Sequence, residues 1–200
     1  LAENKEYRIR ANNVFVFDKQ TKQEREAFDL SAKEGDFTIK FTPHHMTLTL
    51  NKKQAWVTAT APEEQFQSIS KESPEHIHLL MTSDQIIIFD TQTNKIAKRL
   101  NMGMHLGLTD LMMTPEGGYV YVAAETGNAI YKIKTSTYKI DLIQLPPESK
   151  PHQLALSMDG MKLYARNSSK SKIFLIATRT NEIKEQGESK ETKRLSWSTH

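Results

Sequence analysis

The chain has 200 residues and a formal net charge of +3, and its 38% apolar and 26% charged residues are typical of a globular protein. Basic and acidic residues alternate along the sequence instead of gathering in one region, so a dedicated nucleic-acid surface is not expected. Cysteine is absent, which excludes disulfides, thiolate zinc sites, iron–sulfur ligation and a cysteine nucleophile.

Strand-like alternation begins in Tyr7–Leu30, which supplies the last three strands of a four-stranded unit. Its third run, Lys22–Leu30, contains the helix-favouring stretch KQEREAF. Its place in the repeat nevertheless predicts an outer strand, because tertiary packing overrides local propensity. No opening strand precedes Tyr7, so we expect either that the chain is cut inside this unit or that its edge pairs with a C-terminal strand.

The next segment, Thr38–Leu100, fits either one unit with an insertion or two degenerate units. It contains the longest clear apolar run, Gln85–Asp90, which is strand-sized and well short of the ~20 residues of a membrane span. The insertion Ala61–Glu75 is rich in Glu, Ser, Gln and Pro, which predicts an exposed excursion. Such a loop either contains a binding site or has no function. Our partner-binding candidates in it are Phe66 and Ile69.

Two full units follow at 106–145 and 150–186, and their equivalent residues lie 43 positions apart. Alternating apolar and polar residues between turns of Gly, Asp, Asn, Ser or Thr predict four short antiparallel strands in each. One such sheet cannot bury both faces, so neighbouring units must stack face to face. We expect the aromatic side chains buried between them to be Trp56, Tyr121 and Tyr164.

A turn with a shared Thr closes the outer part of each unit; these residues are Thr21, Thr93, Thr137 and Thr180. Asp18 and Asp90 begin the two earlier copies, where a carboxylate can accept hydrogen bonds from backbone N–H groups further on. Lys134 and Ala177 take that place in the later copies, so there the turn should depend on the shared Thr.

The last segment, 187–200, is polar and lacks periodicity, which predicts a flexible tail. Leu195 and Trp197 are its large apolar side chains. They are our further partner-binding candidates, because they can anchor the tail to a partner or to an open edge of the fold.

Four histidines lie in linkers that lead into first strands: His44, His45, His105 and His152. In a ring of stacked sheets these linkers gather near the central axis, where several imidazoles can bind a metal, an anion or a cofactor. The favoured interpretation is that Pro-His is an ordinary strand start, because no Asp or Glu recurs beside these rings to orient them. The sequence also lacks Gly-x-Ser-x-Gly and a Gly-rich phosphate loop. No catalytic residue, metal or cofactor is therefore predicted.

The stretches TPEGGYVYVAAETGNAIYKIKTSTYKI and SMDGMKLYARNSSKSKIFLIATRTNEI resemble the Tyr-Val-Thr-Asn repeat family of lactonase-like β-propellers. Blades of that family contain a Ser-Pro-Asp-Gly turn, an apolar strand, a polar turn, another strand and Asp-x-x-Thr-x-Lys. The resemblance is good over 106–185 and partial before it; Met158 replaces the usual Pro, and Asn51-Lys52 replaces Asp-Gly.

The resemblance implies an all-β fold, a β-propeller over 1–186 with about four to five four-stranded antiparallel blades in a closed or incomplete ring. The expected blades are 7–30, 38–100 with the insertion 61–75, 106–145 and 150–186. An incomplete ring would expose two blade faces carrying residues such as Phe15, Phe17, Ile87 and Phe89, and such apolar faces mark interfaces. We therefore expect neighbouring subunits, or further segments of the same polypeptide, to cover them.

The resemblance specifies the fold more strongly than the function, because related propellers include lactonases, quinoprotein-like and haem-binding periplasmic enzymes, and scaffolds without chemistry. Our leading hypothesis is a non-catalytic protein-interaction scaffold in a bacterial cell-envelope or secretion-type assembly, with other protein subunits as partners. The alternative is a periplasmic lactonase-like or quinoprotein-like enzyme that uses the central channel. The absence of cysteine fits the periplasm and the cytoplasm alike. The start at Leu1 fits either a removed signal peptide or a trimmed chain.

Overall fold

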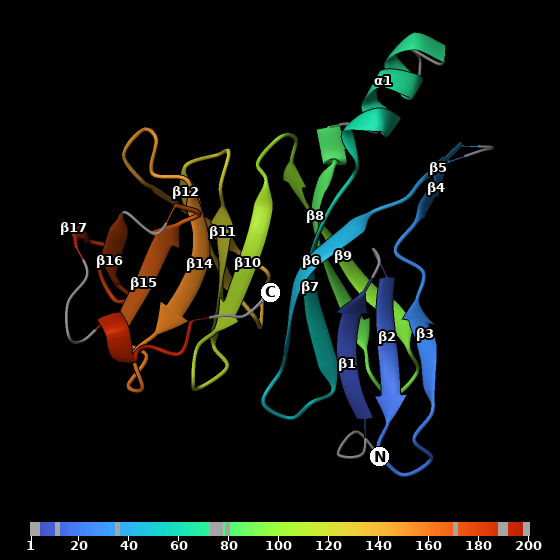
Figure 1. Ribbon diagram of the computed structural model, residues 1–200, viewed down its shortest axis with the longest axis horizontal. Helices are drawn as coiled ribbons and strands as arrows, with labels where there is room; N and C mark the ends of the chain where they lie inside the picture. The colour runs from blue at the N-terminus through green and yellow to red at the C-terminus, as the bar shows by residue number, and fades with distance from the viewer. Residues whose placement is uncertain are drawn as a thin grey trace. The chain divides into compact units, whose positions relative to one another are not determined.

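Regular structure in the described residues is almost entirely antiparallel β-sheet, and each strand pairs with its neighbour in sequence (Figure 1). In this computed structural model the chain forms two compact units, residues 1–105 and residues 106–200. The expected all-β fold is confirmed. The structure describes residues 5–10, 13–34, 37–72, 78, 81–169, 172–187 and 192–197.

Unit 1 contains a three-stranded sheet, a two-stranded hairpin and a four-stranded sheet. The three-stranded sheet has the order β1 (Lys5–Arg10), β2 (Asn13–Asp18) and β3 (Glu24–Phe28). The hairpin consists of β4 (Ala32–Glu34) and β5 (Phe37–Ile39). The four-stranded sheet has the order β6 (Thr42–Leu48), β7 (Gln54–Thr60), β8 (Asp84–Asp90) and β9 (Lys95–Gly103).

Helix α1 (Glu63–Glu72) occupies the connection between β7 and β8. The segment that fitted one or two units therefore forms a single blade whose insertion contains a helix. Two acidic residues in the first turn and Lys71 in the last turn suit the helix dipole. Within the described ranges, no helix combines the length and the apolarity needed to cross a membrane.

Unit 2 contains two four-stranded sheets that follow the repeat closely (Figure 1). The first has the order β10 (Leu108–Met113), β11 (Tyr119–Ala124), β12 (Ala129–Lys134) and β13 (Ile140–Gln144). The second has the order β14 (Pro151–Leu156), β15 (Lys162–Asn167), β16 (Ile173–Ala177) and β17 (Ile183–Gln186). A 3₁₀ turn, η2 (Thr192–Arg194), follows.

Strand β3 forms where local propensity favours a helix. It pairs antiparallel with β2, and Phe17 lies opposite Glu24. At its end, the Phe28 ring stacks on Tyr7 with centroids 5.9 Å apart and lies 3.8 Å from the Phe89 ring. Burial of this aromatic side chain between two others outweighs the weak helical preference of the preceding residues. The predicted outer strand is therefore confirmed.

The four Thr turns share one backbone geometry. In each, the residue after the shared Thr has a φ between 56° and 61° and donates its N–H to the carbonyl four residues earlier; these residues are Lys22, Asn94, Tyr138 and Asn181. The carboxylates of Asp18 and Asp90 accept backbone N–H bonds of 2.8–3.1 Å, as predicted. In the two later copies, the shared Thr accepts a backbone N–H at 3.4 Å instead.

A second Thr in three of these turns ties the outer hairpin of a blade to its inner hairpin, which the sequence analysis did not single out. The hydroxyls donate to main-chain carbonyl oxygens at 2.6–2.8 Å; the pairs are Thr91 with Lys52, Thr135 with Gly117 and Thr178 with Gly160. The first blade has Lys19 at this position.

Stacking of the two blades in unit 1 buries one apolar cluster. Val14 and Phe28 from the first blade contact side chains of the second, which include Ile87 and Phe89. Ile87 and Phe89 were expected on an uncovered blade face and are instead completely buried, because the first blade covers them. Phe15, on the opposite face of β2, is half-buried.

The same tyrosine contact joins the blades of each unit, and we call it the tyrosine latch. In unit 1 the hydroxyl of Tyr7 donates to the carbonyl oxygen of Thr91 at 3.4 Å, and Lys5 Nζ donates to the same oxygen at 3.2 Å. In unit 2 the hydroxyl of Tyr121 donates to the carbonyl oxygen of Thr178 at 3.5 Å. These acceptors occupy equivalent places in their Thr turns.

The expected burial of the repeat aromatics is confirmed, since Tyr121 is 1% exposed while Trp56 and Tyr164 are fully buried. Burial between blades is seen for Tyr121, whereas Tyr164 packs with Leu195 and Trp197 of the tail. The Tyr121 ring belongs to a cluster that unites the two blades of unit 2, with Phe174 and Ile176 from the second blade. Its hydroxyl has a partner in the latch, as the sequence analysis anticipated.

The tail does not behave as a free polar segment over its described part. Leu195 and Trp197 pack against a buried cluster on the last blade, made of Ala155, Tyr164 and Ile173. Trp197 Nε1 donates to the carbonyl oxygen of Thr192 at 3.2 Å. The guanidinium carbon of Arg166 lies 4.3 Å from the Trp197 ring centroid. The expectation of a flexible tail is therefore corrected for residues 192–197, and the predicted anchoring at an edge of the fold is observed: apolar burial and a cation–π contact hold these residues on the last blade.

Candidate binding site

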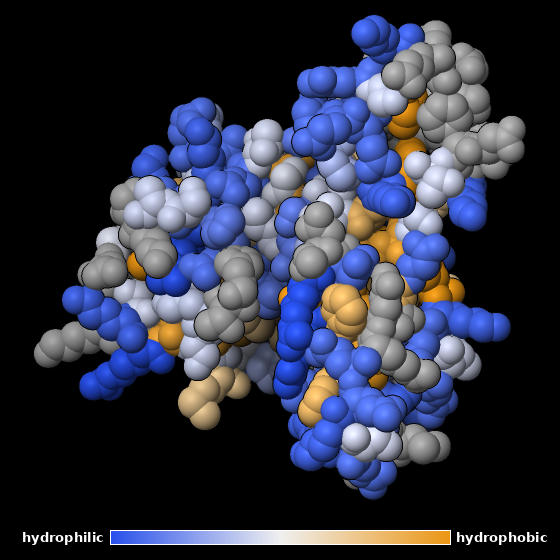
Figure 2. Space-filling view, turned by 45° about the vertical axis from the view of Figure 1, so that its right-hand side comes forward, coloured by the Kyte–Doolittle hydropathy of each residue, from blue (hydrophilic) through white to orange (hydrophobic). Residues whose placement is uncertain are grey.

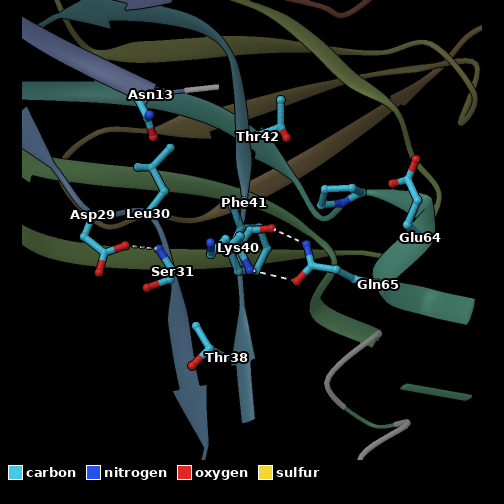
Figure 3. Close-up of a pocket in the computed structure, with 11 residues that line it drawn as sticks. Asn13, Asp29, Leu30, Ser31, Thr38, Lys40, Phe41, Thr42, Glu64 and Gln65 are labelled. Atoms are coloured by element: carbon cyan, nitrogen blue, oxygen red, sulfur yellow. Dashed lines mark hydrogen bonds between the residues drawn. The ribbon is translucent and has the colours of Figure 1, made fainter. Parts of the chain in front are cut away.

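Unit 1 contains a pocket of about 730 Å³ at the place where two insertions into the blade pattern meet. The β4–β5 hairpin with its flanking linkers forms one side, and the beginning of α1 forms the other (Figure 3). We call it the insertion pocket; its walls include Asp29, Ser31, Thr38, Lys40, Phe41 and Gln65. Its volume lies in the range of roughly 300–1,000 Å³ that is usual for small-ligand pockets.

Gln65 attaches α1 to the linker between β5 and β6. Its side-chain amide donates to the carbonyl oxygen of Lys40 at 2.8 Å and accepts the N–H of the same residue at 2.9 Å (Figure 3). This reciprocal pair copies the pattern of two antiparallel strands, so the helix satisfies main-chain groups that no neighbouring strand reaches. One turn later, Ile69 is 3% exposed and belongs to the core of unit 1.

Burial of Ile69 corrects its assignment as a partner-binding residue, because an apolar side chain on the inner face of α1 packs against the core instead of solvent. Phe66, the other candidate in this insertion, has a side chain outside the described residues. The helix therefore contributes to the pocket through its first turn.

Arg99 of β9 fixes the opposite wall. Its Nη2 donates to the carbonyl oxygens of Leu30 and Ser31 at 3.0 and 2.7 Å, and its Nη1 donates to Gln85 at 2.9 Å. The guanidinium carbon also lies 5.6 Å from the Phe41 ring centroid. A charged group that binds two successive carbonyls holds the linker between β3 and β4 in one conformation.

Electrostatics in the insertion pocket favour hydrogen bonding over proton transfer. Hydrogen bonds from Ser31, from its side chain and from its N–H at 2.9 Å, lower the pKa of the Asp29 carboxyl (Figure 3). Burial lowers the pKa of Arg99, which still lies far above neutral pH. Asp29 is therefore a fixed acceptor at neutral pH, whereas a general acid would need a raised pKa. Lys40 and Glu64 add exposed charges of opposite sign.

Apolar side chains complete the lining. Leu30 and Phe41 are buried and form the base of the pocket, and Pro62 is half-buried at its edge. Figure 2 shows apolar surface of this unit among mainly hydrophilic side chains. A small apolar base with several oriented polar groups is the usual construction of a recognition site.

The predicted histidines lie in both units. His44 and His45 are neighbours in β6, and the His44 ring contacts Thr60 Oγ1 at 2.7 Å. His105 is exposed in the linker after β9, with a φ of 53°. His152, in β14, has a carboxylate partner: its Nδ1 lies 2.8 Å from Glu125 Oε2.

Among the residues that the structure describes, no group of three or more His, Asp or Glu side chains is arranged to hold a metal ion. The structure does show a polar residue that the sequence analysis missed. Asp110 in β10 is fully buried, and its carboxylate accepts the N–H of Leu154 from the next blade at 2.6 Å. No local pattern marks this residue, because its acceptor role depends on a strand 44 residues away in sequence.

Similarity to solved structures shows that the chain has the β-propeller fold. Virginiamycin B lyase from Staphylococcus aureus matches 88% of the chain with 19% identity and a TM-score of 0.62. The β-propeller domain of Cps50 (Swd1) from Myceliophteria thermophila matches 93% with 10% identity and a TM-score of 0.66. A putative 6-phosphogluconolactonase from Bacteroides fragilis matches 88% with 17% identity and a TM-score of 0.54.

The chain spans about half the length of these structures, 49% of the lyase, 58% of the Swd1 domain and 51% of the lactonase chain. No protein-family model matches the sequence, and no curated protein matches it. At these low identities the likeness establishes the fold alone, because the same propeller carries enzymes and scaffolds.

Proposed function

We propose that the protein is a non-catalytic interaction scaffold, built from Tyr-Val-Thr-Asn-like blades, that binds a segment of a partner protein at the insertion pocket. One observation carries this proposal: the β4–β5 hairpin and α1, the two departures of the chain from its repeat, line the same pocket. Insertions into a rigid scaffold are where binding residues concentrate.

The chemistry of the pocket suits an extended polypeptide segment. Asp29 offers a fixed carboxylate to N–H donors, and the exposed Lys40, in the linker on the other end of the hairpin, offers a donor. Phe41 and Leu30 provide an apolar base for one side chain. A peptide presents donors, acceptors and apolar groups together, so it can use all three.

Site-specific photo-crosslinking tests the proposal. A photoreactive residue replaces Thr38, which is exposed at the edge of the pocket, in the full chain expressed in its native cells. We expect a discrete adduct with one partner protein. The matched control carries the same probe at Leu142, which is 55% exposed in unit 2.

Two further variants define the result. Asp29→Asn and Lys40→Ala should each reduce the Thr38 adduct severalfold while leaving the thermal unfolding of the chain unchanged, because both side chains are exposed. Equal adducts from Thr38 and Leu142, or adducts that neither pocket variant affects, would contradict a binding role for the pocket.

A second candidate function is a lactonase-like or quinoprotein-like enzyme, and one contact favours it. The Glu125 carboxylate lies 2.8 Å from His152 Nδ1, which is how carboxylates orient an imidazole that acts as a general base. In this alternative, His152 of unit 2 would act as the general base at the central channel. Lactone turnover that follows metal content and is lost in His152→Ala would replace the scaffold proposal.

We further propose a bacterial periplasmic or cell-envelope location, on the resemblance of the repeats to Tyr-Val-Thr-Asn propellers. Fractionation of native cells tests it. Release of the protein by osmotic shock is the expected result, and retention with cytoplasmic markers would contradict it.

A further inference from the structure

Each blade of unit 2 has two apolar faces, and the repeat makes them comparable. The face of the first blade that carries Tyr121 is covered by the second blade, through Phe174 and Ile176. In the second blade the equivalent tyrosine is Tyr164, because Tyr121 lies opposite Lys132 and Tyr164 lies opposite Leu175 in matching registers. The Tyr164 face is therefore the one on which a further blade would stack.

The tail occupies that face. Leu195 and Trp197 pack on Tyr164, Ala155 and Ile173, and Arg166 stacks on the Trp197 ring at 4.3 Å. We call residues 192–197 the cap. Tyr164 is fully buried beneath it, as Tyr121 is beneath a blade.

The first blade of the chain carries a face equivalent to the one that covers Tyr121 in unit 2. Phe174 and Ile176, which cover Tyr121, lie beside Leu175, the residue opposite Tyr164. In β2 the residue opposite Tyr7 is Val16, so Phe15 and Phe17 are the equivalents of Phe174 and Ile176. Phe15 and Phe17 are only half-buried, and Phe17 lies under the Arg8 guanidinium at 4.8 Å.

We infer that the Tyr164 face is a blade-docking surface that the cap keeps closed, and that its competing occupant is the Phe15–Phe17 face of a second copy of this chain. Both surfaces belong to the repeat. The cap covers Tyr164, and Phe15 and Phe17 are half-buried within unit 1. Contact between two different faces is head-to-tail, so association of uncapped chains continues beyond one pair unless a ring closes. Terminal repeats need a cover of this kind to remain separate.

Removal of the cap contacts in the full chain tests the inference. We expect the double variant Leu195→Ala, Trp197→Ala to show, by size-exclusion chromatography with light scattering, at least a doubling of mass as concentration rises. The wild-type chain should keep its mass over the same range. The matched control Leu142→Ala removes an exposed apolar side chain elsewhere in unit 2 and should behave like the wild type.

Two further experiments identify which faces associate. Phe17→Glu placed in the cap variant should return the mass to that of the wild type, because it puts a charge on the proposed partner face. A synthetic peptide of residues 188–200, added in excess to the cap variant, should do the same by covering the Tyr164 face. Association that persists in both experiments would overturn the assignment of the surfaces.

Arg166→Ala keeps the inference testable if the double variant does not fold, which circular dichroism would show. This substitution removes the stacking on Trp197 and its bond to Gln153 at 2.8 Å, and leaves the apolar contacts of the cap in place. It should produce the same concentration-dependent rise in mass at higher concentration. A folded cap variant or a folded Arg166→Ala chain that keeps its wild-type mass at every concentration would refute the inference.

Discussion

Unit 1 and unit 2 each stack one blade on another through a tyrosine latch, but they follow the repeat to different degrees. Unit 2 keeps two four-stranded sheets with short connections. Unit 1 has a first blade of three described strands, an additional hairpin between its blades and a helix inside the second. The insertion pocket belongs to the irregular unit. Regular blades thus provide rigidity, and the departures from them provide a site.

The two latches also differ in their cation. In unit 2 the amine of Lys132 lies 2.6 Å from the Thr178 carbonyl oxygen and 4.7 Å from the Tyr119 ring centroid. Burial lowers the pKa of this amine. In unit 1 the cation comes from Lys5, on a different strand of the blade. The tyrosine hydroxyl and the carbonyl acceptor are retained while the position of the lysine changes, so these two groups are the constant part of the contact.

The largest expected effect is at the centre of the regular unit. Tyr121→Ala should lower the free energy of unfolding by about 3 kcal/mol or more, because it leaves a cavity between two blades and removes the latch. Tyr7→Ala should cost less, because Tyr7 is only half-buried. Urea denaturation followed by tryptophan fluorescence reports on both units, through Trp56 in unit 1 and Trp197 in unit 2. Equal losses of unfolding free energy in both variants would contradict the expected difference between the two units.

The next effect depends on pH. Burial raises the pKa of Tyr121 to about 12, whereas an unfolded tyrosine has a pKa of 10.0. The folded state therefore holds this proton more tightly, and its contribution to stability is complete below pH 10 and lost as pH rises toward 12. The loss should reach about 2 kcal/mol across this window. Tyr121→Phe, which cannot ionise, should show a shallower decline when denaturation is measured at several alkaline pH values.

A smaller effect is expected in the irregular unit. Gln65→Ala removes two hydrogen bonds to the main chain of Lys40, so the first turn of α1 should open with a loss of about 1 kcal/mol. Hydrogen exchange of the Lys40 amide should accelerate about fivefold, by the usual relation between free energy and population. Gln67→Ala changes an exposed residue of the same helix and should leave the exchange rate unaltered.

The smallest effect concerns the tie between the two hairpins of a blade. Thr178→Val removes the hydroxyl that donates to the Gly160 carbonyl oxygen at 2.8 Å, and we expect a loss of about 0.5–1 kcal/mol. Thr180→Val, in the same turn, affects an exposed hydroxyl with a 3.4 Å contact and should cost less. Differential scanning calorimetry of the two variants compares their losses of stability. A larger loss for Thr180→Val would show that the hydrogen bond within the turn contributes more than the tie between the hairpins.

The parts of the fold that repeat could be predicted from sequence, because alternation and turn chemistry are local properties. Asp90 and Thr137 marked their turns correctly for this reason. The helix in the insertion was described as an excursion, although Glu63 and Glu64 at its start and Lys71 at its end are helix signals. The polar composition of the insertion predicts an exposed loop, whereas its charge order predicts the helix that the structure shows.

The candidate site could not be predicted in the same way. Asp29, Lys40 and Gln65 come from three connections, and each is an ordinary polar residue in its own context. The pocket exists only because Arg99, from an outer strand, holds one connection and Gln65 holds another. Leu195 and Trp197 were predicted to anchor the tail to a partner or to an open edge of the fold, and the structure shows the second alternative, on the last blade of their own chain.

The tyrosine latch has a consequence for how such a chain changes in length during evolution. Each stacked pair supplies its own hydroxyl donor, Tyr7 or Tyr121, and takes a main-chain carbonyl from the following copy. A main-chain acceptor is present whatever residue occupies the position. A blade that carries the tyrosine can therefore be duplicated or deleted in one genetic event without a compensating substitution in its neighbour. The second blade of unit 1 has Trp56 at the equivalent position and cannot form this joint.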